Sequence, residues 1–179
     1  MRYPDFLRTA VLLFAASATA LAIVSIAGAR GKDDTTLQYV ALAWWAAAAA
    51  AGAWVGRRQL ANRATAKLLA DARTTPLLPE LQPGTILFNR LWWLLLFTIA
   101  AGGVAFLVPQ VPAVGAGYAL AFALAWRNHS AAVVAVEERD GVRFYVEHNS
   151  PFKPTQLLRT PGFRKNEPSP TDVRVGATP

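Results

Sequence analysis

Residues 91–126 read LWWLLLFTIAAGGVAFLVPQVPAVGAGYALAFALAW and contain no Asp, Glu, Lys or Arg. A bilayer core is about 30 Å thick, and one helix needs about 20 residues to cross it. The stretch is therefore too long for one span and just long enough for two. Pro109 and Pro112 lie near its middle, where a turn between two helices belongs. This stretch predicts a helical hairpin that crosses a membrane.

The composition of the whole chain agrees with a membrane protein. Hydrophobic residues make up 54%, charged residues 16%, and the mean hydropathy is +0.27. The net charge of +7 is concentrated between and after the apolar runs, which indicates contact with anionic lipid headgroups rather than with nucleic acid. Arginine outnumbers lysine and alanine runs are long, as in bacterial proteins from GC-rich genomes. The absence of cysteine excludes disulfides and thiolate chemistry.

Residues 1–56 predict a first transmembrane hairpin with spans at about 9–29 and 37–56. Gly52 and Gly56 stand four residues apart in the second span, a spacing that lets a neighbouring helix approach closely, so we expect them at a packing face. A cleaved signal peptide is the alternative for the first span, because small residues occupy 27–29. Its apolar run exceeds the usual length of about 7–15 residues, which favours an uncleaved anchor.

Residues 57–85 form a basic link that is predicted to include an amphipathic helix. We expect Arg57, Arg58, Arg63 and Lys67 in this link to contact anionic lipid headgroups. A second transmembrane hairpin follows at 86–128. Its last helix would cover only about 20–24 Å, so a re-entrant segment is an alternative to a full span. We favour the span, because re-entry would place the charged tail on the other side.

Residues 129–165 predict a β-hairpin followed by a proline-rich extension, and residues 166–179 a disordered tail. A three-residue loop with Gly141 in the left-handed conformation would pair Val134 with Val146 and Val136 with Phe144. These four side chains would form one apolar face. An isolated hairpin is marginal in water, so we expect this face to lie against a partner.

The predicted fold class is an all-α membrane protein with four transmembrane helices in two hairpins, a short cytoplasmic β-hairpin and a disordered C-terminal tail. Positive charges favour the cytoplasmic side of a membrane. The basic link and the tail hold most of the lysine and arginine residues. We therefore expect both termini in the cytoplasm and the protein in the inner, or plasma, membrane.

The sequence contains no phosphate-binding loop and no cluster with metal-ligand spacing. We therefore expect no catalytic, cofactor-binding or metal-binding residue. The favoured function is non-enzymatic: an accessory, scaffold or assembly subunit whose hairpin and tail meet an unknown protein partner or a second copy. One alternative is an oligomeric channel or transporter subunit. The other is an enzyme at the headgroup layer that uses His129, His148 and the carboxylates near them.

Overall fold

The computed structural model describes residues 1–31, 35–58, 63–74, 83–105, 107–108, 110–147 and 156–161. Within these ranges four helical segments are long and apolar enough to cross a membrane. They are α1 (Tyr3–Arg30), α2 (Thr35–Arg58), α4 (Pro83–Val104), and α5 (Gln110–Trp126) with its continuation α6 (His129–Asp140). The chain is a multi-pass membrane protein.

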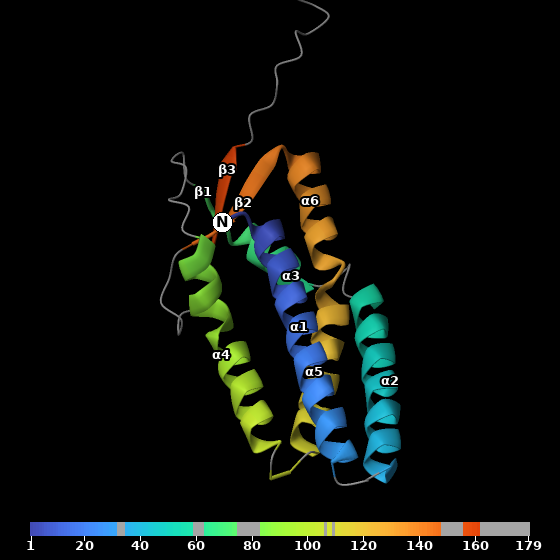
Figure 1. Cartoon of the computed structure of the whole chain (residues 1–179). Helices are drawn as coiled ribbons and strands as arrows, with labels where there is room; N and C mark the ends of the chain where they lie inside the picture. The colour runs from blue at the N-terminus through green and yellow to red at the C-terminus, as the bar shows by residue number, and fades with distance from the viewer. Residues whose placement is uncertain are drawn as a thin grey trace, which may run out of the picture.

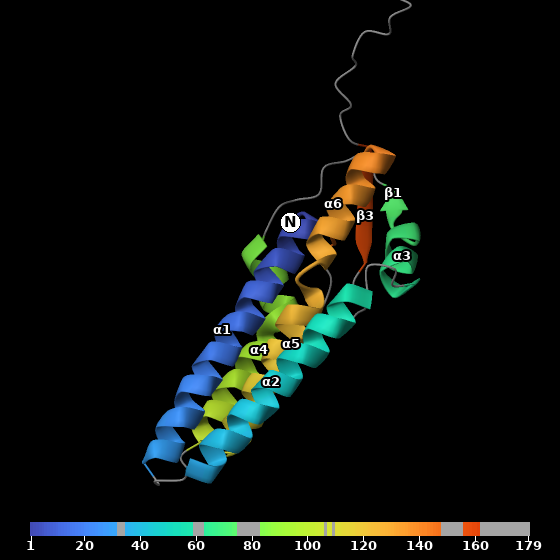
Figure 2. The same ribbon diagram turned by 90° about the vertical axis from the view of Figure 1, so that its right-hand side faces the viewer.

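The four long helices run side by side and alternate in direction along the bundle (Figure 1). The N-terminus, α6 and a small sheet lie at one end, which we call the cap end (Figure 2). The end of α1 and the start of α2 lie at the opposite end. Helix α5 runs from the end of the bundle opposite the cap toward the cap, where α6 continues it (Figure 1).

Helix α5 is the centre of the bundle and packs against both α1 and α2. Its buried positions are nearly all alanine or glycine: Ala113, Gly115, Ala116, Gly117, Ala119, Ala123 and Ala125. On the facing side of α2, a Cβ added to Gly52 would lie 2.5 Å from the carbonyl oxygen of Ala121. One added to Gly56 would lie 2.7 Å from the carbonyl oxygen of Leu124. The backbones of α2 and α5 are in direct contact there, as small residues allow.

We expect Gly52→Ala to lower the stability of the bundle by about 1–3 kcal/mol, the usual cost of overpacking a close contact. The new methyl group meets backbone atoms of α5, which cannot move aside as a flexible side chain can. Thermal unfolding in detergent would measure the loss. Gly103→Ala is the matched control, because a Cβ on Gly103 of α4 meets nothing within 4 Å. Equal melting temperatures for the two variants would contradict the close contact.

The cap end carries two short helices and a three-stranded sheet. Besides α6, these elements are α3 (Arg63–Ala70), β1 (Arg73–Thr74), β2 (Val142–Val146) and β3 (Leu157–Pro161). The strand order is β1-β3-β2, with β1 parallel and β2 antiparallel to β3. The N-terminus extends this sheet, because the Val146 N–H donates to the Met1 carbonyl at 3.0 Å and Arg2 forms a bridge with Tyr145.

A single apolar core joins the cap to the bundle. It consists of Tyr3, Phe6, Leu7, Ile86, Val133, Val142, Phe144, Val146 and Leu157. The first two turns of α1 supply three of these side chains, and the start of α4 supplies another. The sheet and α6 supply the remainder. The described part of the cap therefore rests on the ends of the long helices and shares its core with them.

The predicted β-hairpin at 133–148 is wrong. Residues 129–140 form α6, and β2 pairs with β3 (Leu157–Pro161). Gly141 does adopt the predicted left-handed conformation, with φ 63° and ψ 34°, but it ends a helix and does not turn a hairpin. Buried Val133 and Glu137 stand four residues apart, which is the helical period. The alanine and valine residues at 131–136 (AAVVAV) fit a helix as well as a strand, and in the structure they form a helix.

Further predictions concern where elements begin and end. Helix α4 begins at Pro83, earlier than the predicted start at 86, because proline is well suited to the first turn of a helix. Helix α2 ends at Arg58, and α3 is a separate helix. The segment predicted as a proline-rich extension contributes strand β3. The predicted disordered tail at 166–179 lies outside the described residues.

Candidate functional site

The four basic residues of the link lie near the cap end. Arg57 is exposed in the last turn of α2, and Lys67 is exposed on α3. Arg58 ends α2, and Arg63 begins α3. These positions bring the expected headgroup contacts to the same end of the bundle as the sheet.

The four residues expected on a partner-facing apolar face do not form one. Phe144 and Val146 are each 2% exposed and belong to the core of the cap. Val134 and Val136 lie on α6, where both are partly buried and Val136 packs against that core. The apolar face of β2 is therefore covered by the chain's own first helix and by α6. This outcome corrects the expectation that a partner covers it.

The best-defined polar site is built around Glu137, which is 3% exposed. Its Oε2 accepts a hydrogen bond from Arg2 Nη2 at 2.6 Å, and its Oε1 accepts one from the Phe144 backbone N–H at 2.9 Å. Arg143 Nη1 lies 3.8 Å from Oε2. A buried carboxylate needs such partners, because burying an uncompensated charge is very costly. The hydrogen bond to Glu137 raises the pKa of Arg2 above its ordinary value, so the guanidinium stays charged.

Glu137 thus ties three separate parts of the chain together: the N-terminus, α6 and β2. Both of its carboxylate oxygens are engaged within the protein. We call this set of contacts, Arg2–Glu137–Phe144, the cap latch. Its geometry serves to hold the sheet against the first turn of α1 and leaves no oxygen of Glu137 without a partner.

The other residues considered for acid–base chemistry are dispersed. The His129 ring lies 6.4 Å from that of Trp126, and Glu138 is exposed on α6. Asp140 pairs with its neighbour Arg139 at 2.8 Å. His148 lies outside the described residues. Across the ranges that the structure describes, no group of three His, Asp or Glu residues could hold a metal ion.

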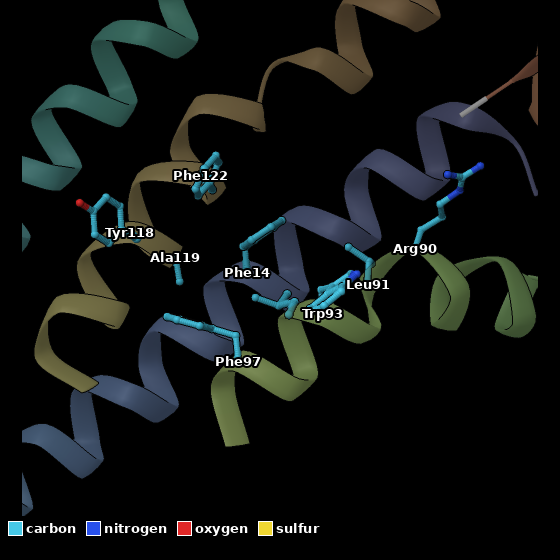
Figure 3. A pocket seen from close by; sticks show the side chains of 9 residues that line it. Phe14, Arg90, Leu91, Trp93, Phe97, Tyr118, Ala119 and Phe122 are labelled. Carbon is cyan, nitrogen blue, oxygen red and sulfur yellow. The ribbon is translucent and has the colours of Figure 1, made fainter. Parts of the chain in front are cut away.

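A groove of about 420 Å³ opens between α1, α4 and α5 (Figure 3). It is lined by Phe14, Arg90, Leu91, Trp93, Leu94, Phe97, Tyr118, Ala119 and Phe122. The volume falls within the range of about 300–1,000 Å³ that is typical of ligand pockets. Apart from Arg90 and the Tyr118 hydroxyl, the lining is aromatic or aliphatic.

Sequence reasoning missed both the cap latch and the groove. Arg2 and Glu137 are separated by almost the entire span of described helices, and nothing in their local sequence links them. The groove residues come from three helices, so no spacing within one segment reveals them. The one signal available in the sequence was Arg90, which is the single charged residue of α4.

No family model, curated protein or solved structure matches the chain.

Proposed function

We propose that the chain is a non-enzymatic accessory or assembly subunit of a bacterial inner membrane, and that its cytoplasmic cap binds a partner protein. The observation that carries this proposal is the joining of the cap to the membrane helices through a shared core and the cap latch. Because the cap is held to the membrane helices in this way, its surface has a fixed orientation relative to them. Glu137 is the buried carboxylate that would be a candidate for acid–base catalysis, but both of its oxygens accept hydrogen bonds that hold the cap together.

The outer face of α6 is the surface that we assign to the partner. Ala131, Ala135, Glu138 and Arg139 are exposed and fall at helical spacing on one side of α6. Two alanines let another backbone approach closely, and the charges beside them supply specificity. This face replaces the β-hairpin as the proposed contact, because the apolar side of β2 is already buried.

The distribution of charge supports the orientation. Arg57, Lys67 and Arg73 lie exposed toward the cap end, and positive segments favour the cytoplasmic side. The described part of the opposite end carries Arg30 in the last turn of α1. We infer that the cap and the N-terminus face the cytoplasm. We also infer that α1 stays in the mature protein, because Tyr3, Phe6 and Leu7 fill the core of the cap.

Single cysteines test the proposal without interference, because the chain has none of its own. With Ala135→Cys on α6, we expect a membrane-impermeant maleimide to react only after the cells are permeabilised. With Gly31→Cys, at the opposite end, we expect reaction in intact cells. A maleimide photo-crosslinker on Ala135→Cys should then give a discrete protein adduct in native membranes.

Ile99→Cys is the control for the crosslink, because Ile99 is exposed on α4 within the apolar span. We expect it to give no discrete protein adduct. Labelling of Ala135→Cys in intact cells would reverse the orientation. If crosslinkers at residues 131, 135 and 138 all failed to capture a protein, the cap would not be a partner-binding surface.

A further inference from the structure

The outward face of the cap sheet, on the side opposite the apolar core, carries two exposed arginines. In β2 the side chains of Val142, Phe144 and Val146 are buried in that core. Successive side chains of a strand point to opposite faces, so Arg143 and Tyr145 belong to the outward face. The burial of β2 alternates accordingly, and Arg143 is exposed.

The strand registers place the other members of this face. Side chains of paired residues on neighbouring strands lie on the same side of a sheet. Tyr145 is paired with Leu158 of β3, which in turn is paired with Arg73 of β1. Arg143 is paired with Thr160, further along β3. Arg143 and Arg73 therefore stand on the two strands that flank β3, with Leu158 between them.

Both guanidinium groups are available to a ligand. The side chain of Arg143 is 51% exposed, and its Nη1 lies 3.8 Å from Glu137 Oε2, too far for a hydrogen bond. That oxygen already accepts a hydrogen bond from Arg2. Arg73 is exposed and takes part in none of the ion pairs of the described residues. Each of the two guanidinium groups has five N–H donors, and an arginine fork pairs well with a carboxylate through two parallel hydrogen bonds.

The spacing of the two arginines suits an extended chain. Strands lie about 4.8 Å apart and residues rise about 3.4 Å along a strand, so two strands and two residues separate the Cα atoms of Arg143 and Arg73 by about 12 Å. In an extended peptide, residues i and i+4 point to one side and lie about 13 Å apart. Residue i+2 of such a peptide would lie over Leu158, beside Tyr145.

We propose that the outward face of the sheet binds an extended acidic segment of a partner protein. The carboxylates at positions i and i+4 of this segment pair with Arg143 and Arg73, and an apolar side chain at i+2 packs on Leu158. The charge of the face selects an acidic ligand, and the strand register sets the spacing of its carboxylates. This inference rests on the proposed function, because it adds a second contact for the partner that binds the cap.

The surface of the membrane suits this face less well. Strands β2 and β3 point away from the ends of the membrane helices rather than lying across them (Figures 1 and 2). Headgroups would therefore reach only the edge of the face that is nearest the bundle, where the Val146 N–H donates to the Met1 carbonyl. Glu147 follows at that edge and places a carboxylate there, which opposes anionic lipid.

Fluorescence anisotropy with a labelled peptide would test the site on the whole protein in nanodiscs of neutral phosphatidylcholine. The probe is Gly-Glu-Ser-Leu-Ser-Glu-Gly, and the matched peptide has glutamine in place of both glutamates. We expect only the acidic peptide to bind. Arg73→Gln and Arg143→Gln should each weaken its binding about threefold, and the double variant about tenfold, as expected for exposed ion pairs.

The controls separate this site from general attraction to positive charge. Arg139→Gln removes an exposed cation of α6 that pairs with Asp140, and should leave the affinity unchanged. A peptide with its two glutamates adjacent should bind more weakly than the probe. Equal binding of the acidic and glutamine peptides, or an unchanged affinity in the double variant, would overturn the proposal.

Two further results would also decide against the site. If the amides of β1 and β2 became protected from hydrogen exchange only in phosphatidylglycerol nanodiscs, the occupant would be the membrane surface. If the peptide failed to bind while Ala135→Cys still gave its protein adduct, the partner would use α6 without the sheet. Absence of the adduct would overturn the proposed function itself, so the two failures are distinguishable.

Discussion

Phe144→Ala is expected to lower the free energy of unfolding of the cap by about 3–5 kcal/mol, the usual cost of removing a buried phenyl ring. Phe144 is 2% exposed and lies in the core shared by β2 and the first turns of α1. Hydrogen exchange of the protein in nanodiscs would measure the effect locally. The amides of β2 should be protected in the parent protein and should exchange rapidly in the variant.

Tyr145→Ala is the matched control for this substitution. Successive side chains of a strand point to opposite faces, and Tyr145 is only partly buried. We expect its loss to change exchange in β2 much less. Equal exchange in the two variants would mean that the core of the cap does not depend on the face that carries Phe144.

The membrane part of the fold was predictable from the sequence because each span is a long run of apolar residues. A run such as 91–126 cannot remain in water, and its length sets the number of crossings. The packing of the helices against one another was only partly predictable from the sequence. Gly52 and Gly56 have a recognisable spacing, whereas the contact of Gly117 with the Trp44 indole joins two helices that no local pattern connects.

The cap could not be predicted from local pattern. Residues 134–136 (VAV) alternate in size as in a strand, but Val133 and Val136 stand three positions apart, as on one side of a helix. The spacing of the apolar residues therefore did not separate strand from helix. The partner of β2 is a five-residue strand among prolines, and a third strand of two residues lies more than 60 positions earlier in the chain. The sequence identified Phe144 and Val146 as apolar side chains that must be buried. They pack with Tyr3, Phe6 and Leu7, which in the sequence look like the start of any membrane helix.

Glu137→Leu is expected to destabilise the cap by about 3 kcal/mol, because it removes two hydrogen bonds to a charged acceptor, each worth about 1.5–3 kcal/mol. The Phe144 N–H would be left buried without its acceptor. The side chain of Arg2 is 35% exposed, so water compensates part of the loss on that side. Exchange of the β2 amides and of residues 1–3 in nanodiscs would report the release of the N-terminus from the sheet.

Two glutamine variants divide this effect into its parts. Glu137→Gln keeps an oxygen that accepts the Phe144 N–H but removes the charge that Arg2 binds, so we expect roughly half the loss seen with leucine. Glu138→Gln changes an exposed neighbour on the same helix and should leave exchange unchanged. If Glu137→Leu left the β2 amides as protected as in the parent, apolar packing alone would hold the cap to the bundle. If glutamine were as harmful as leucine, the ion pair with Arg2 would dominate, and the hydrogen bond to Phe144 would contribute little.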